Sequence, residues 1–277
     1  MILKLAFWIL SLQTLVKPCP CYTEKDFVKN IKRISVNKLP ESLNESSGLI
    51  NINDTLYSIN DSGGKTYIYR FSVNGLLYDS IFVPNSINYD WEEITNDKEG
   101  NIYIGDFGNN TNKRKDLKIY SFNSEKTTTS IPFAYPGQNH FPPVRRREKN
   151  YDCEAMIFRD GKLILFSKNK TSKNVSVYSL NPDQQNPDIK QIGTIRIRER
   201  ITGAGYESDS VAVLLSYGKI LRVSLPKEDS PDSFLKILTC KRIPFTRQAE
   251  AITYIPTGTL LITNEQGQIF KYSYIYR

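Results

Sequence analysis

A strand-rich unit that recurs five times is the feature that most constrains the fold of this chain. The units begin at Glu45, Trp91, Asp152, Ile201 and Gln248. Each begins with a strand whose first residue is polar or small. A turn and an apolar second strand such as "IYIGDF" or "LLITNE" follow, and then a third strand such as "KIYSF". Short strands separated by Asn, Asp, Gly and Pro indicate an all-β fold. A four-stranded repeat of roughly 45 to 60 residues is typical of the blades of a β-propeller.

The number of blades follows from how the last unit ends. A fourth strand completes most units, as in "LLYDSIFVP" and "TSIPFAY", but the chain stops at the third strand of the last one. We expect the segment Val28–Leu39 to supply the missing outer strand, which would close the ring and remove an exposed sheet edge. The sequence therefore predicts one domain over residues 22–277 with five four-stranded blades. A sixth blade within residues 111–150 is the alternative.

The first residues have the layout of a secretory signal peptide. Lys4 precedes the apolar run Leu5–Val16, and the polar break "KPCPC" follows. We expect a signal peptide over residues 1–21, in place of an N-terminal anchor or a buried helix, and a secreted or periplasmic protein. No later stretch is apolar enough to span a membrane. The formal net charge of +8 fits an anionic small-molecule ligand, whereas nucleic acid is a poor match for an exported chain. The oligomeric state is left open.

Cysteine and histidine usage restricts the chemistry. Cys153 and Cys240 could pair with each other, one of them could pair with Cys21, or both could be free. The single histidine, His140, excludes a multi-histidine metal centre. A Ser-His-Asp mechanism would have to use this one histidine, which lies in a proline-rich loop. Hydrolysis by this chain would instead use a metal-bound water with a carboxylate base.

Glutamates recur near the start of the first strand of the units. Aligning the units gives the equivalent positions Ser47 or Gly48, Glu93, Glu154, Gly203 or Ala204, and Glu250. First strands line the channel of a propeller, so three carboxylates would converge there and repel one another unless a cation neutralises them. Hard oxygen donors favour Ca²⁺ over zinc or copper. The predicted metal ligands are Glu93, Glu154 and Glu250, with help from Ser47. The alternative is that each Glu accepts hydrogen bonds from backbone amides of its own blade.

Polar residues follow the second strand of several units. They are Asn60 and Asp61, Asp106, Lys168 and Asn169, and Asn264 and Glu265. We predict that Asp61 or Asp106 orients a water molecule for catalysis. The predicted binding residues for an anionic group are Lys168 and, from a basic loop, Arg145, Arg146 and Arg147. Asn and Asp are also ordinary turn residues, and an arginine run is also typical of a solvated loop.

Four of these stretches resemble a known family. "SSGLININDTLYSIND", "DWEEIT", "DCEAM" and "QAEAIT" look like the channel strands of the soluble calcium-activated apyrases, five-bladed propellers that hydrolyse nucleoside di- and triphosphates around a central Ca²⁺. In this resemblance Ser47 matches the first-strand serine, and Glu93, Glu154 and Glu250 match later channel glutamates. Gly48 stands where the family has Glu, and the family's Asp-Leu-Asp segment is missing near the mature N-terminus. The phrases "NDSG" and "GDFGNN" are also similar to an exported propeller family of Bacteroidetes-type bacteria.

The sequence leaves two hypotheses for function. The first is a calcium-dependent hydrolase of phosphoesters or phosphoanhydrides. The second is a non-catalytic propeller whose ion is structural and whose loops bind a glycan, a peptide or an envelope partner. Only the first predicts a turnover that the Glu154→Ala substitution removes.

Overall fold

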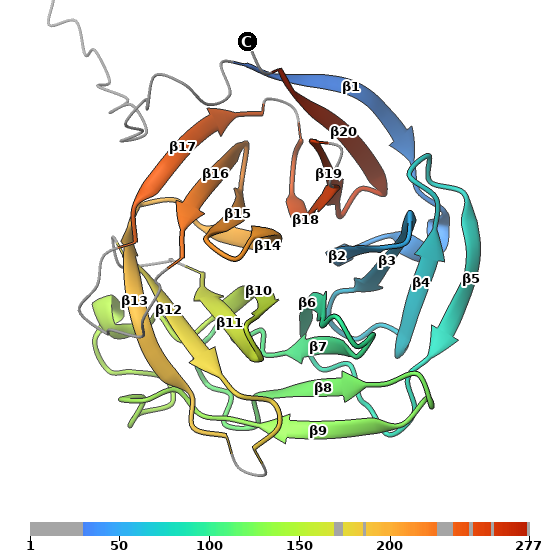
Figure 1. The fold of residues 1–277 in the computed structure, drawn as a ribbon. Coiled ribbons are helices and arrows are strands. Elements are labelled where there is room, and N and C mark those ends of the chain that lie inside the picture. The colour runs from blue at the N-terminus through green and yellow to red at the C-terminus, as the bar shows by residue number, and fades with distance from the viewer. Residues whose placement is uncertain are drawn as a thin grey trace, which may run out of the picture.

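Five four-stranded antiparallel sheets stand in a ring around a central axis (Figure 1). The computed structural model describes residues 30–168, 174–184, 187–225, 235–243, 246–255 and 258–275. The prediction of a five-bladed β-propeller is confirmed. The sixth-blade alternative is wrong, because residues 111–150 hold only the outer half of the second blade and its loops. The signal peptide predicted over residues 1–21 lies outside the described residues.

Each blade runs from the axis outward in four layers of strands. The inner strands are β2 (Ser46–Ile52), β6 (Trp91–Asn96), β10 (Cys153–Arg159), β14 (Ile201–Ser208) and β18 (Ala249–Ile255). The second strands are β3 (Thr55–Asn60), β7 (Ile102–Asp106), β11 (Lys162–Ser167), β15 (Val211–Ser216) and β19 (Thr259–Asn264). The third strands are β4 (Tyr67–Phe71), β8 (Lys118–Phe122), β12 (Asn174–Leu180), β16 (Lys219–Ser224) and β20 (Gln268–Ile275). The outer strands are β5 (Leu77–Phe82), β9 (Thr128–Pro132), β13 (Lys190–Arg196), β17 (Ile237–Arg242) and β1 (Asn30–Lys38). Two single-turn 3₁₀ helices, η1 (Glu41–Leu43) and η2 (Arg146–Glu148), lie in loops.

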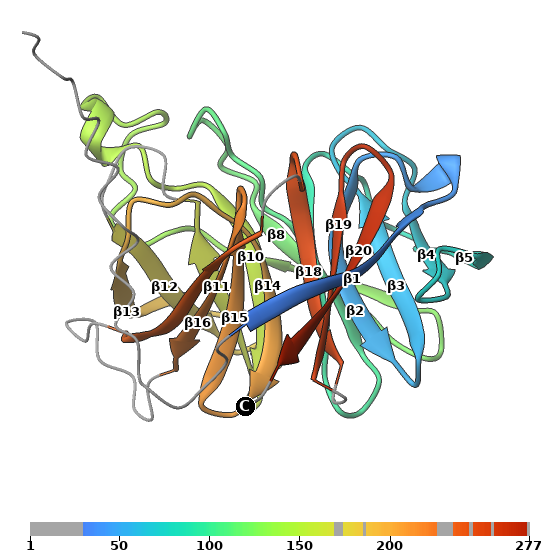
Figure 2. The ribbon, with the colours of Figure 1, turned by 90° about the horizontal axis from the view of Figure 1, so that it is seen from above.

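The N-terminal strand closes the ring, as the sequence predicts. β1 pairs antiparallel with β20, with Val36 opposite Phe270. Figure 2 shows β1 lying along the blade that β18, β19 and β20 form. Just beyond β1, the Leu39 amide donates to the Gly267 carbonyl at 2.8 Å. The strand near the N-terminus therefore completes the last blade and covers the edge that β20 would otherwise expose.

The hydrophobic core is divided into five clusters, and each cluster lies between two neighbouring blades. Between the third and fourth blades, for example, Phe166 and Val177 share a cluster with Leu214 and Leu221. The second strands β15 and β19 are buried on both faces, so their sequences are nearly continuous apolar runs and do not alternate with polar residues. Burial of these faces between blades is the main source of stability of the ring.

Each inner strand carries a register irregularity close to its start. In β6 it falls between Trp91 and Glu93, and in β10 between Cys153 and Ala155. A bulge of this kind adds a residue and changes which face a side chain takes. The second residues of four inner strands line one cavity at a mouth of the channel: these residues are Ser47, Glu92, Glu154 and Glu250. The third residue is Glu93 in β6 and a small residue in the other inner strands: Gly48, Ala155, Gly203 and Ala251.

The structure therefore corrects the sequence alignment by one residue in the second blade. Glu92, and not Glu93, occupies the position of Glu154 and Glu250. The register irregularity falls at Glu92 in β6, at Glu154 in β10 and at Glu250 in β18, so these three residues are equivalent and Glu93 is the residue that follows.

Two further expectations concern the thiols and the membrane. Cys153 is a free, buried cysteine, so it is not paired with Cys240, and burial raises the pKa of its thiol to about 12. Among the described residues, no helix is long and apolar enough to cross a bilayer.

Candidate functional site

Carboxylates converge where the inner strands begin, at one mouth of the channel. This group, called the acidic mouth below, consists of Asp61, Asp90, Glu92, Asp152, Glu154 and Glu250. A cavity of about 180 Å³ is lined by four of them, Asp61, Glu92, Glu154 and Glu250, and by the carboxylates of Glu45 and Glu265. Its walls also include Ser47, Lys168 and Tyr217.

The carboxylates are close enough to share a cation. Oxygen atoms of Glu92, Asp152 and Glu154, all buried, lie within 4.8 Å of one another, and so do those of Asp61, Asp90 and Glu92. Glu92 belongs to both triplets. Carboxylate oxygens at such spacing can ligate a divalent ion, so the acidic mouth has the geometry of a metal site.

Burial and mutual repulsion both resist ionisation at the acidic mouth. Burial raises the pKa of Glu92 well above its usual range, and the nearby charges of Glu154 and Asp61 raise it further. Burial likewise raises the pKa of Asp90 to about 6, with Asp61 adding to the effect. A bound cation would remove this cost by neutralising the carboxylates together.

Lys168 and Tyr217 also line the cavity and contact two of its carboxylates. The Lys168 ammonium donates a hydrogen bond to Glu154 Oε1 and lies 6.0 Å from the centre of the Tyr217 ring. Burial lowers the pKa of Lys168, but the Glu154 charge outweighs it and keeps that pKa above its ordinary value. The Tyr217 hydroxyl donates to Glu250 Oε1 at 2.9 Å. Burial raises the pKa of Glu250 to about 7, although Lys168 and Tyr217 act in the opposite direction.

The loop after β7 shapes the side of the acidic mouth formed by Asp90 and Glu92. Gly108 in this loop lies so near that a Cβ there would overlap Asp90 Oδ2 and Glu92 Oε1. Arg114 holds the loop in place: its guanidinium donates to the Gly108 carbonyl at 2.9 Å and to Asp106 Oδ1 at 2.9 Å. The "GDFG" sequence thus provides the close backbone approach that the carboxylates require.

We expect the Gly108→Ala substitution to weaken cation binding at least about tenfold while changing the stability of the cation-free protein little. The added methyl group would push aside the ends of two side chains and leave the backbone intact. Calcium titration by calorimetry, together with chemical denaturation in chelator, measures both quantities. Unchanged calcium affinity would contradict this role of Gly108.

The predicted site residues divide into those at the acidic mouth and those away from it. Ser47, Asp61, Glu154, Lys168 and Glu250 line its cavity. The Ser47 hydroxyl also donates to the Glu92 carbonyl at 2.7 Å.

The other predicted catalytic and binding residues lie elsewhere. Asp106 is fully buried in its ion pair with Arg114 and does not line the cavity. Arg145, Arg146 and Arg147 are exposed residues at η2, and Arg145 lies 3.7 Å from Glu148. They do not line the cavity either.

Glu93 is fully buried and lies between the inner strands of the first four blades. Its Oε2 accepts a hydrogen bond from the Ala204 amide at 2.9 Å and its Oε1 accepts one from the Ile94 amide at 3.1 Å. The amides of Leu49 and Met156 also bond to it, so one carboxylate joins the inner strands of four blades. The oxygens of Glu93 accept hydrogen bonds from backbone amides. The sequence left open this alternative to metal binding, but with amides of the same blade, whereas these amides come from several blades.

Gly48 allows Glu93 to occupy this place. A Cβ on Gly48 would lie 2.8 Å from Glu93 Oε1 and 2.6 Å from the Ile94 nitrogen, and its φ of +73° disfavours other residues. The absence of Glu at this position therefore has a structural cause within this chain.

Sequence reasoning missed Asp90, Glu92 and Asp152. A spaced signal was present: "DWE" and "DCE" both read Asp-x-Glu at the entry to an inner strand. Aligning the two units on this triplet would have placed Glu92 beside Glu154.

Comparison with known proteins supports the fold. No family model matches this sequence, and no curated protein matches it. The chain is similar in structure to a protein provisionally assigned as a gluconolactonase (TM-score 0.51, 9% identity, 91% of this chain and 94% of that one). It is similar to the PQQ-bound aldose sugar dehydrogenase of Streptomyces coelicolor (TM-score 0.50, 10% identity, 88% and 98%). It is also similar to virginiamycin B lyase of Staphylococcus aureus (TM-score 0.43, 14% identity, 86% and 69%).

At these identities the likeness concerns the propeller fold alone. None of the three is an apyrase, so the resemblance to that family stays a prediction.

Proposed function

We propose that the acidic mouth binds Ca²⁺. The observation that carries the proposal is the pair of carboxylate triplets that share Glu92, each with its oxygens within 4.8 Å of one another. All donors are hard oxygens and no imidazole or thiolate takes part, which suits Ca²⁺ better than a transition metal. The proposed ligands are Asp61, Asp90, Glu92, Asp152 and Glu154. Of the ligands expected from the sequence, this set keeps Glu154, takes Glu92 in place of Glu93, and leaves Ser47 and Glu250 out of direct contact with the cation.

We further propose that the protein is an exported hydrolase of phosphoesters or phosphoanhydrides. The cavity of about 180 Å³ has room for an ion and one phosphoryl group, with the rest of a substrate outside. The bound cation would polarise a phosphoryl oxygen and offset its charge. Lys168 would hold a second phosphoryl oxygen by its ammonium group.

Glu250 is positioned to act as the general base of this reaction. Tyr217 fixes its carboxylate, and its pKa of about 7 suits proton transfer near neutral pH. The water oxygen would form a bond to phosphorus, the bond from phosphorus to the leaving oxygen would break, and the water proton would pass to Glu250. This assigns to Glu250 the role that the sequence gave to Asp61 or Asp106.

A substrate panel tests the proposal. We expect phosphate release from nucleotides, phosphomonoesters or phytate with Ca²⁺ present, no release in chelator, and a loss of at least about a hundredfold in Glu154→Ala and Glu250→Gln. Glu125→Gln, at an exposed glutamate on the second blade, is the matched control.

The same panel separates catalysis from a structural ion. If wild-type protein binds Ca²⁺ but releases no phosphate, the hydrolase proposal fails and the cation site stands. If Glu92→Gln binds Ca²⁺ as tightly as wild type by calorimetry, the cation site fails.

A further inference from the structure

A second and larger cavity, of about 910 Å³, opens at the opposite mouth of the channel. All five inner strands contribute to it through their later residues, among them Ile50, Thr95, Ile157, Gly205 and Thr253. The described residues that line it include none that line the acidic-mouth cavity, and Glu93 lies between the two sets along the inner strands. Its volume falls in the range of small-molecule sites.

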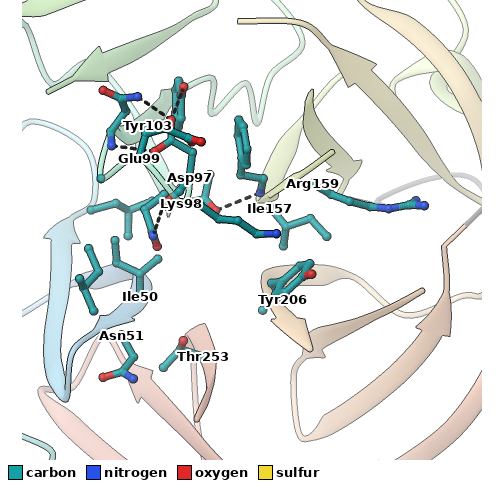
Figure 3. A pocket seen from close by; sticks show the side chains of 18 of the residues that line it. Ile50, Asn51, Asp97, Lys98, Glu99, Tyr103, Ile157, Arg159, Tyr206 and Thr253 are labelled. Atoms are coloured by element: carbon teal, nitrogen blue, oxygen red, sulfur yellow. Dashed lines mark hydrogen bonds between the residues drawn. The ribbon is translucent and has the colours of Figure 1, made fainter. Parts of the chain in front are cut away.

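The walls of this opposite-mouth cavity combine aliphatic and aromatic surfaces. Figure 3 shows Ile50, Ile157 and Tyr206 around a common space. Tyr206 is 39% exposed, and its hydroxyl donates a hydrogen bond to Asp209, which fixes the ring. Phe158 is stacked on Tyr103 with ring centres 5.4 Å apart. Exposed aromatic faces with a fixed position attract both apolar groups and cations.

The charges that line the cavity are predominantly negative. Its carboxylates are Asp97, Glu99, Asp160, Asp183 and Asp209, and its cations are Lys98 and Arg159. Arg159 forms an ion pair with Asp160 at 3.0 Å. Burial raises the pKa of Tyr206 to about 12, and the neighbouring charge of Asp209 adds to the rise. The lining thus has the opposite sign to the +8 of the whole chain, which favours a cationic ligand.

We propose that the opposite-mouth cavity binds an organic cation, an amine or guanidinium group carried on an apolar body. The cationic group would lie against the Tyr206 ring within the field of the carboxylates, and the apolar body would cover Ile50 and Ile157. This site is independent of the proposed hydrolase function.

Matched probes test the charge preference. Calorimetry with 2-phenylethylamine, 2-phenylethanol and phenylacetate, in saturating Ca²⁺ to occupy the acidic mouth, compares a cation, a neutral molecule and an anion of one shape. We expect the amine to bind, the alcohol to bind about tenfold more weakly, and the anion to give no signal. Higher salt should weaken the amine alone. Absence of amine binding, or equal binding of amine and alcohol, would overturn the proposal.

Variants locate the bound amine. We expect about tenfold weaker amine binding in Tyr206→Ala and a few-fold loss in Glu99→Gln, an exposed position where folding is not at risk. Tyr78→Ala, at a 55% exposed tyrosine of β5, should bind like wild type. Binding that survives Tyr206→Ala and Glu99→Gln but is lost in Glu92→Gln would place the amine at the acidic mouth and refute this site.

Discussion

The Glu93→Ala substitution is expected to lower the free energy of unfolding by about 3 to 5 kcal/mol, because it leaves buried backbone amides of several blades without an acceptor. The amides of Ala204 and Ile94, from the fourth and second blades, bond to opposite oxygens of this carboxylate. Each unsatisfied buried donor costs about 1 to 3 kcal/mol, and the emptied volume adds to the loss. Urea denaturation followed by circular dichroism measures the change.

A second variant keeps this prediction informative if Glu93→Ala does not fold. Glu93→Gln has nearly the same shape but turns an amide NH₂ toward backbone N–H donors, so we expect an intermediate loss. Glu99→Ala, at an exposed glutamate in the turn that follows β6, should change stability by no more than about 0.5 kcal/mol. Wild-type stability in Glu93→Gln and Glu93→Ala would refute the role of Glu93 as the link between blades.

Calcium is expected to raise the melting temperature by roughly 5 to 10 °C at a hundredfold excess over its dissociation constant, and the rise should grow with pH. Such an excess is worth about 2.7 kcal/mol of stability. Folding raises the pKa of Asp90 to about 6 and that of Glu250 to about 7, so the stability of the cation-free protein depends on pH. These groups stabilise the fold fully below their ordinary pKa values, and this stability is lost as pH rises through about 6 to 7.

Melting curves at pH 5 and pH 8, in chelator and in Ca²⁺, test this coupling. In chelator the protein should melt at a lower temperature at pH 8, and Ca²⁺ should remove most of the difference because it binds the ionised carboxylates. Glu92→Gln should show little response to Ca²⁺, whereas Glu125→Gln should respond like wild type. The same pH dependence with and without Ca²⁺ would rule out a cation at the acidic mouth.

The fold was predictable because each repeat shows its strands locally. Apolar runs such as "LLITN" become middle strands buried on both faces, and turn residues separate them. The truncated last unit and the spare strand near the N-terminus pointed to the closure that β1 and β20 make.

The candidate site was predictable only in part. Glu154, Glu250 and Asp61 were expected at the channel and line the acidic mouth. Asp106 was expected there on the same grounds, yet Arg114 holds it in a buried pair. Nothing in the local sequence around Asp106 shows whether a loop will fold back to neutralise it.

The sequence by itself thus determined the repeat, the five blades, the closing strand and the presence of carboxylates at the start of inner strands, because these depend on local hydrophobic pattern and chain length. Only the tertiary structure decided which carboxylates meet. The bulge of β6 brings Glu92 to the acidic mouth, whereas Glu93 accepts hydrogen bonds from amides of the inner strands. It also decided that two separate cavities exist, because turns and strands from all five blades come together only once the ring closes.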